Sequence, residues 1–156
     1  MKFSSLIEQY AAGPQLLRQA VRGLSQDQLR ARPVAGRWST LEVICHLADF
    51  DLVYADRLKR VIAEHEPTLF GGDPDAFAAK LAYHERDLAE ELALIEGCRN
   101  STTRILRTLG EADFARIGRH NEAGPLTLEE LLKRVTEHAT HHAKFIDEKR
   151  EAQGAR

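Results

Sequence analysis

The chain has 156 residues, of which 43% are hydrophobic and 29% are charged, with a formal net charge of −2. This length suits one domain with a full hydrophobic core, so we expect a single domain over residues 1–156, while the near-neutral charge argues against disorder and against a nucleic-acid-binding surface. The sequence shows no apolar signal region and no run of about 18 apolar residues, so we expect a cytoplasmic protein with no membrane partner.

Helical periodicity runs through nearly the whole chain, and no segment rich in Val, Ile and Thr is long enough to indicate a sheet. We therefore predict an all-α fold. Gly13-Pro14 is expected to break a short N-terminal helix, because Pro14 suits the first position of a new helix, which would end at Gly23. The stretch SQDQL then predicts a short helical turn capped by Ser25, with Gln28 completing a capping box.

The second main helix is predicted to begin after Ser39, where Ser39 and Glu42 have the spacing of a capping box. A third helix is expected over about residues 87–109, with Gly110 as its stop signal. Between these two helices, residues 64–77 (EHEPTLFGGDPDAF) have turn chemistry and are predicted to form a loop.

The last main helix repeats the capping box with Thr127 and Glu130. Each half of the chain thus contains a long helix, a short capped turn, a loop and a capped helix. This weak internal repeat predicts a four-helix bundle with short connecting helices, built from two helix pairs related by pseudo-two-fold symmetry.

Three of the seven histidines lie in the stretch TEHATHHAKFID of the last helix. A helical projection places His138 and His142 on or beside the apolar face and turns His141 away from it. Residues four apart have β-carbons about 5–6 Å apart, so this pair could share one metal ion. A third ligand is available in His46, which periodicity permits at the edge of the second helix's apolar surface. The alternative is that these histidines are solvated or belong to a polar network in the core.

Other candidate residues receive structural interpretations. His65 and His84 flank the predicted loop and are expected to be exposed, and His120 is expected to make local backbone hydrogen bonds. Cys45 and Cys98 lack a C-x-x-C spacing and are interpreted as buried, unbridged residues.

A metalloprotease is excluded by one position. The zincin pattern places Glu directly after the first of two paired histidines, and here His138 is followed by Ala139. Glu137 precedes the histidine instead, so it does not satisfy the pattern.

The segments GLSQDQLRARPVAGRWSTLEVICHLADFD and GPLTLEELLKRVTEHATHHAKFI resemble the DinB-like superfamily, in particular its YfiT-type branch of metal-dependent hydrolases and thiol transferases. The likeness runs from about Pro14 to Ile146, and its most specific parts are the Trp-Ser before the second helix, the HLAD that follows and the terminal His-x-x-x-His. The resemblance implies a four-helix bundle that holds one divalent metal ion through His46, His138 and His142. Assigned members of the family include bacillithiol- and mycothiol-dependent transferases and isomerases. Because these reactions differ, the resemblance implies a bound metal more firmly than it implies one reaction.

Three neutral ligands leave an ion open to water or substrate, which allows either hydrolysis or transfer of a small thiol. Imidazole binds Zn²⁺, Ni²⁺, Fe²⁺ and Mn²⁺, so the sequence does not select among these metals. Asp49 is interpreted either as a residue that orients an imidazole or acts as a base, or as a solvent-facing residue. His141 either binds an anionic substrate or lies on the surface, and no catalytic residue is assigned.

These observations predict a metal-dependent enzyme acting on small molecules, as a thiol transferase or a hydrolase. Its expected partners are a small-molecule substrate, including a low-molecular-weight thiol, and a second copy in a homodimer. The alternative function is a non-catalytic bundle in which the metal ion ties two helices together, as in a stress-related dimeric scaffold.

Overall fold

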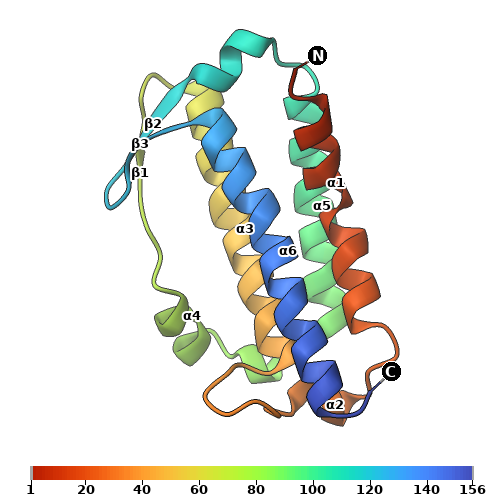
Figure 1. Ribbon diagram of the computed structural model, residues 1–156. Helices are drawn as coiled ribbons and strands as arrows, with labels where there is room; N and C mark the ends of the chain where they lie inside the picture. Colours follow the sequence, from red (N-terminus) through yellow and green to blue (C-terminus); the bar gives the residue numbers. More distant parts are fainter. Residues whose placement is uncertain (1, 156) are drawn as a thin grey trace.

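The computed structural model describes residues 2–155, which form a four-helix bundle with short connecting elements (Figure 1). The four long helices are α1 (Ser4–Val21), α3 (Thr40–Ala63), α5 (Leu88–Leu106) and α6 (Leu128–Ala152). The connecting elements are α2 (Gln26–Arg30), β1 (Thr68–Leu69), α4 (Pro74–Lys80), the 3-10 helices η1 (Tyr83–Glu85) and η2 (Glu111–Ala115), β2 (Ile117–His120) and β3 (Gly124–Thr127). The predicted bundle is confirmed. No helix within residues 2–155 combines the length and the apolar character needed to cross a membrane.

The helix order around the bundle places α3 beside α6. Each long helix packs against two others, α1 against α5 and α6, and α3 against α5 and α6. After α3 the chain returns along the outside of the bundle through α4, so α3 and α5 run in the same direction and α6 runs opposite to α3 (Figure 1). The second and last predicted helices are therefore antiparallel neighbours, which allows side chains of both to meet.

The predicted capping boxes define the starts of three helices. Before α3, the Ser39 amide donates to Glu42 Oε2 at 2.7 Å and the Glu42 amide donates to Ser39 Oγ at 3.1 Å. Thr127 and Glu130 form the same pair of bonds before α6, and Ser25 with the side chain of the third helical residue does so before α2. These bonds satisfy backbone amides that a helix start leaves without intrahelical partners.

The break predicted at Gly13-Pro14 is wrong, because α1 continues through both residues. Pro14 has no N–H to donate to the Tyr10 carbonyl one turn earlier, which is the usual reason for a break. Here the Arg99 guanidinium of α5 donates to that carbonyl at 3.0 Å. Gly13 makes room for it, since a Cβ at this position would lie 2.1 Å from Arg99 Nη1.

Arg99 links all four long helices from the centre of the bundle. Its side chain is fully buried and forms two bonds with Asp51 of α3, at 2.6 and 2.9 Å. It also donates to the Val135 carbonyl of α6 at 3.1 Å and to Tyr10 of α1. A buried charge is tolerated only when paired and hydrogen-bonded, and these bonds meet that condition. They hold α3 and α6 in a defined relative position.

The predicted loop over residues 64–77 contains β1 and the start of α4, and a three-stranded sheet forms beyond the helices. β1 pairs in parallel with β2, with Thr68 opposite Arg119, and β2 pairs antiparallel with β3. Strands of two to four residues are too short to show an alternating pattern, so the sequence did not reveal them. The third helix also ends earlier than predicted, at Leu106, and Gly110 is the N-cap of η2 instead of terminating α5.

Candidate metal centre

The structure brings His46 of α3 together with His138 and His142 of α6. Potential ligand atoms of the three side chains all lie within 4.8 Å of one another, and we call this group the histidine cluster. The Nε2 atoms of His46 and His138 are 2.8 Å apart, and the centroids of the three rings are 4.7–4.8 Å apart. The trio named from the sequence is therefore a spatial cluster.

Helix periodicity and packing explain these positions. His46 is only 4% exposed and lies between the rings of Trp38 and Phe50, at centroid distances of 5.0 and 4.8 Å. His138 and His142 are one turn apart and half-buried on the side of α6 that faces α3. His141 is exposed, as its projection predicted, although its ring lies 5.3 Å from that of His142.

Burial keeps the histidine cluster neutral. Chiefly because the rings are removed from water, the pKa of His46 falls to about 4 and those of His138 and His142 to about 3. Asp49 and Asp75 raise the pKa of His46 through space, but burial outweighs them, and the cluster itself contains no carboxylate. Neutral imidazoles with free lone pairs are the form that binds divalent metal ions.

Unpaired ring nitrogens support a fit to a metal ion. The Nδ1 atoms of all three rings are buried and have no hydrogen-bond partner within residues 2–155. The close Nε2 contact between His46 and His138 pairs only one nitrogen of each ring. Buried polar atoms normally have hydrogen-bond partners. Three neutral imidazoles with unpaired ring nitrogens therefore fit the binding of a divalent metal ion better than a polar network in which every atom is paired.

A cavity of about 690 Å³ opens onto the cluster. Its walls combine aromatic and polar side chains. Besides the three histidines, they are Trp38, Phe50, Tyr54, Pro74, Arg134, Glu137 and His141. A cavity of this size admits a small molecule to the histidines.

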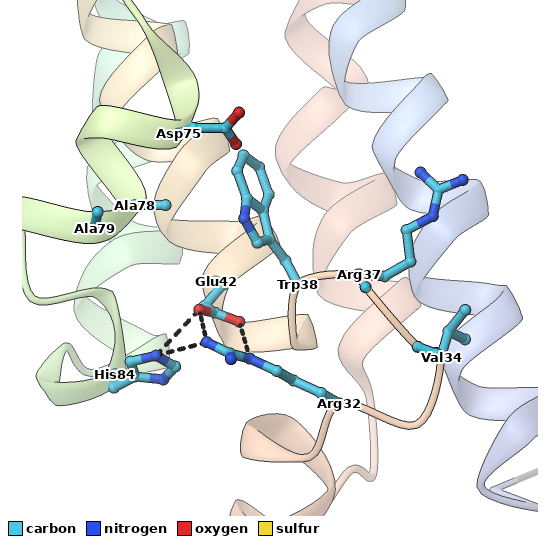
Figure 2. Close-up of a pocket in the computed structure, with 11 residues that line it drawn as sticks. Arg32, Val34, Arg37, Trp38, Glu42, Asp75, Ala78, Ala79 and His84 are labelled. Atoms are coloured by element: carbon cyan, nitrogen blue, oxygen red, sulfur yellow. Dashed lines mark hydrogen bonds and ion pairs between the residues drawn. The ribbon is translucent and has the colours of Figure 1, made fainter.

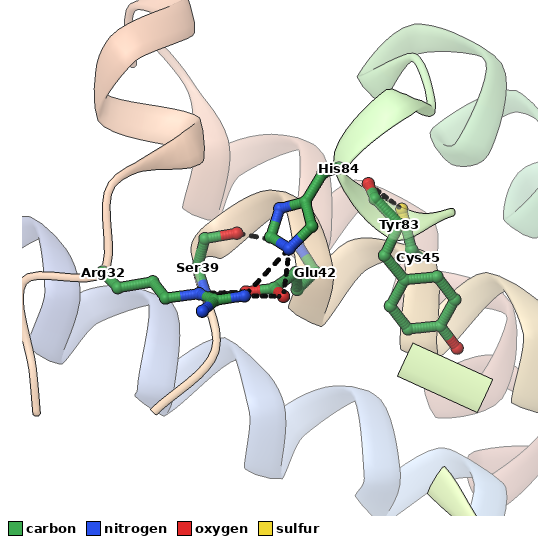
Figure 3. Close-up of polar contacts among 6 residues, drawn as sticks. All are labelled: Arg32, Ser39, Glu42, Cys45, Tyr83 and His84. Atoms are coloured by element: carbon green, nitrogen blue, oxygen red, sulfur yellow. Dashed lines mark hydrogen bonds and ion pairs between the residues drawn. The ribbon is translucent and has the colours of Figure 1, made fainter. Parts of the chain in front are cut away.

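The start of α3, which positions Trp38 and His46, is held by contacts that the sequence did not reveal. Arg32 donates two bonds to the buried Glu42 carboxylate, at 2.6 and 3.0 Å, and His84 Nε2 lies 3.1 Å from Glu42 Oε1 (Figure 2). Burial raises the pKa of Glu42, but the bonds from Arg32 and from the capping serine outweigh it and lower the pKa below its usual value. Figure 3 shows the same convergence beside a bond from Cys45 Sγ to the carbonyl of Tyr83.

Asp49 binds an arginine and not a histidine. Its two carboxylate oxygens accept from Arg86 at 2.9 and 3.0 Å, and Arg86 also binds Glu91. These bonds give Asp49 a structural role between α3 and the segment before α5, and none of them orients an imidazole of the cluster.

The remaining candidates follow their structural interpretations with one exception. His65 is exposed, and His120 Nδ1 accepts from the amides of Glu122 and Ala123. Both cysteines are free, and burial raises their pKa values, to about 12 for Cys45, so neither is a reactive thiolate at neutral pH. The exception is Cys98, which the sequence predicts to be buried but which is only half-buried. His84 is exposed, as predicted, and it also contacts the buried Glu42.

Comparison with known proteins finds a matching family and relatives that carry the name "Putative metal-dependent hydrolase". A model of the DinB superfamily matches residues 9–146. A protein of Oceanobacillus iheyensis named "Putative metal-dependent hydrolase" is 30% identical over 133 residues, covering 85% of this chain and 77% of that protein. "Putative metal-dependent hydrolase YfiT" of Bacillus subtilis is 30% identical over 136 residues, covering 86% of this chain and 76% of that protein.

Solved structures show the same fold. The structure of YfiT from Bacillus subtilis, described as a probable metal-dependent hydrolase with an unusual four-helix bundle topology, matches with a TM-score of 0.90 and 28% identity, over 96% of this chain and 86% of that one. A DinB-like protein from Bacillus subtilis matches with a TM-score of 0.64 and 16% identity, over 97% of this chain and 93% of that one. This second likeness concerns the fold alone.

Proposed function

Since the chain belongs to the DinB superfamily and gathers His46, His138 and His142 at one cavity, we propose that it is a metal-dependent enzyme acting on small molecules. The reaction we propose is attack of a small nucleophile on an electrophilic substrate. The nucleophile is a low-molecular-weight thiol in a transferase or water in a hydrolase. The observation that supports this function best is the neutral three-histidine cluster at an open cavity of about 690 Å³.

The donor set favours catalysis over a purely structural ion. Structural zinc sites are usually closed by four protein ligands, whereas catalytic sites use three. Within residues 2–155 the cluster contains three histidines and no cysteine or carboxylate. A divalent ion bound there would act as a Lewis acid that makes water or a thiol nucleophilic near neutral pH.

The chain's own residues would bind and shield the reacting groups. Trp38 and Phe50 pack against His46 and limit the access of bulk water to that ring. Tyr54 lies near the second ligand, with its ring centroid 6.5 Å from that of His138. Aromatic walls with a few polar groups are typical of small-molecule sites.

Metal content and turnover test the proposal together. The purified protein is analysed for bound metals, loaded with Zn²⁺, Ni²⁺, Fe²⁺ or Mn²⁺, and assayed with electrophilic substrates in the presence and absence of small thiols. Turnover should require the metal, and His46→Ala should abolish it while helical circular dichroism is retained. His141→Ala is the matched control and should keep the metal.

The same assays separate the two reactions and the scaffold. Turnover that depends on added thiol identifies a transferase, and turnover without thiol identifies a hydrolase. A metal-loaded protein that turns over neither class, yet loses stability when the ion is removed, would establish the metal-tied scaffold instead. Sedimentation equilibrium of the same samples tests the proposed homodimer.

A further inference from the structure

A second, smaller cavity of about 240 Å³ adjoins the cavity of the histidine cluster. Trp38 and His142 line both cavities. The smaller one is otherwise lined by Gly36, Arg37, Val43, Asp75, Phe145 and Lys149. A molecule occupying it would therefore lie against His142, beside the larger cavity.

Lys149 is a buried cation with little compensation. The residue is 3% exposed, and its only hydrogen bond within residues 2–155 is to the Phe145 carbonyl of its own helix, at 3.2 Å. An ammonium group has three donors, and a buried charge normally requires an anionic partner. His142, Phe145 and Lys149 follow one stripe of α6, so the side chain lies beside the cluster.

A second cation approaches from the loop before α3. The Arg37 guanidinium lies 5.5 Å from the centroid of the Phe145 ring, and Lys149 Nζ lies 5.8 Å from the same centroid. Figure 2 shows Arg37 extending from its loop toward α6, on a different side of Trp38 from Glu42. The two positive groups therefore flank one aromatic wall of the cavity.

The surrounding carboxylates leave these cations unpaired. Glu148 and Glu42 act on Lys149 only through space, and Glu42 is already bound to Arg32. Asp75 is the one acidic residue that lines the cavity. The residues that line the cavity therefore carry two positive charges and one negative charge, and this net charge of +1 matches a singly charged carboxylate better than a doubly charged phosphate.

We propose that Arg37 and Lys149 form a carboxylate-binding subsite beside His142, so that the substrate is a small carboxylic acid with an apolar part. The carboxylate accepts hydrogen bonds from the guanidinium and the ammonium, and the apolar part packs on Trp38 and Phe145. That the bound acid is a substrate rests on the proposed function. The anion binding itself uses only charges of the chain and needs no metal.

The test uses phenylacetate as the probe and metal-free protein, so that the carboxylate has no ion to bind. Affinity is measured by isothermal titration calorimetry at constant ionic strength, with phenylacetamide as the neutral analogue. Trp38 is the only tryptophan of the chain, so a saturable change in its fluorescence locates the probe beside it. Phenylacetate should bind at least about tenfold more tightly than phenylacetamide, because charge-assisted bonds are the strong ones.

Two variants and a matched control assign the binding to the subsite. Lys149→Met and Arg37→Met should each weaken phenylacetate binding about tenfold or more, while Lys144→Met, at an exposed position of the same helix, should leave it unchanged. Arg37 lies on an exposed loop, so its variant tests the proposal even where Lys149→Met fails to fold. Absence of binding to the wild type, equal binding of the amide, or unchanged affinity in Arg37→Met would overturn the proposal.

The outcome is separable from that of the proposed function. A protein that binds phenylacetate but no metal would support the proposed subsite and refute the proposed metal-dependent enzyme. A protein that binds metal and turns over substrates, but shows no preference for carboxylates, would support the proposed enzyme and refute the proposed subsite.

Discussion

Replacing Gly13 by alanine should destabilise the bundle, although glycine in the middle of a helix is normally a weak residue. Alanine at an exposed helix position is about 1 kcal/mol more favourable than glycine. At Gly13, however, the new Cβ would lie 2.1 Å from Nη1 and 2.8 Å from Cζ of Arg99. Those are atoms of a buried guanidinium held by Asp51 and two carbonyls, so it cannot swing into solvent.

The expected magnitude follows from the bonds that Arg99 would lose. Displacing the guanidinium would break its bond to the Tyr10 carbonyl and distort its pair with Asp51. Breaking a buried ion pair costs about 3–5 kcal/mol, because the remaining charge stays buried without a partner. After an offset of about 1 kcal/mol from helix propensity, Gly13→Ala should lower the free energy of unfolding by about 2–4 kcal/mol.

Urea denaturation followed by far-ultraviolet circular dichroism measures this change. Gly97→Ala is the matched control, since Gly97 lies in α5, is exposed, and a Cβ there would have no atom within 4 Å. The control should raise stability by about 0.5–1 kcal/mol, opposite in sign to Gly13→Ala. Both proteins are measured without metal, because a ligand of the native state would add its own stabilisation. A Gly13→Ala variant as stable as the wild type would refute the role assigned to this contact.

Three further predictions concern the histidine cluster. His142→Ala should lose stoichiometric metal in elemental analysis, whereas His141→Ala should retain it; a metal-loaded His142→Ala would remove the assigned ligand. Chelation should leave helical circular dichroism unchanged, because capping boxes and the buried Arg99 define the bundle without an ion; unfolding on chelation would favour the structural-ion alternative. In the metal-free protein the pKa values of the three native histidines are about 3–4, below the value of about 6.5 in the unfolded chain, so the unfolded chain binds more protons. The midpoint of urea unfolding should therefore fall as pH drops from about 6.5 toward 4. A midpoint that rises over this range would contradict the burial of neutral rings.

The helix starts could be predicted because their chemistry is local. A capping box needs only a Ser or Thr and a Glu or Gln three residues later, and each of the pairs at Ser25, Ser39 and Thr127 forms it. The i,i+4 spacing of His138 and His142 is equally local. The sequence therefore sufficed for these three helix starts and for the spacing of the histidine pair.

The wrong predictions concern segments whose local structure depends on residues far away in the sequence. Gly13-Pro14 resembles a helix break until Arg99, far along the chain, supplies the hydrogen bond that proline removes. The same holds for β1 and β2, which are distant in the sequence and join only because the chain after α3 returns along the bundle. Local helix and strand propensities carry no information about such distant partners.

The site shows the same division. Periodicity allowed His46 at the border of an apolar surface, and the family resemblance selected it, but only the antiparallel packing of α3 on α6 brings it within ligand distance of the pair. Arg37 and Lys149 gave no sequence signal, since single basic residues on a loop and near a helix end are common on protein surfaces.

The position of Arg99 explains why the cluster should exist before any metal binds. Its partner Asp51 follows His46 on α3, and its acceptor Val135 precedes His138 on α6, each within about two helical turns of the ligand. One buried guanidinium thus sets the spacing and rotation of both helices at the level of the cluster. An ion entering such a preformed site need not order the chain, so its binding energy is not consumed by folding, as it is in small zinc-dependent domains. A preformed, neutral site that faces a cavity is suited to presenting an ion to substrate, whereas an ion required only for structure would be expected where the bundle lacks other links between α3 and α6.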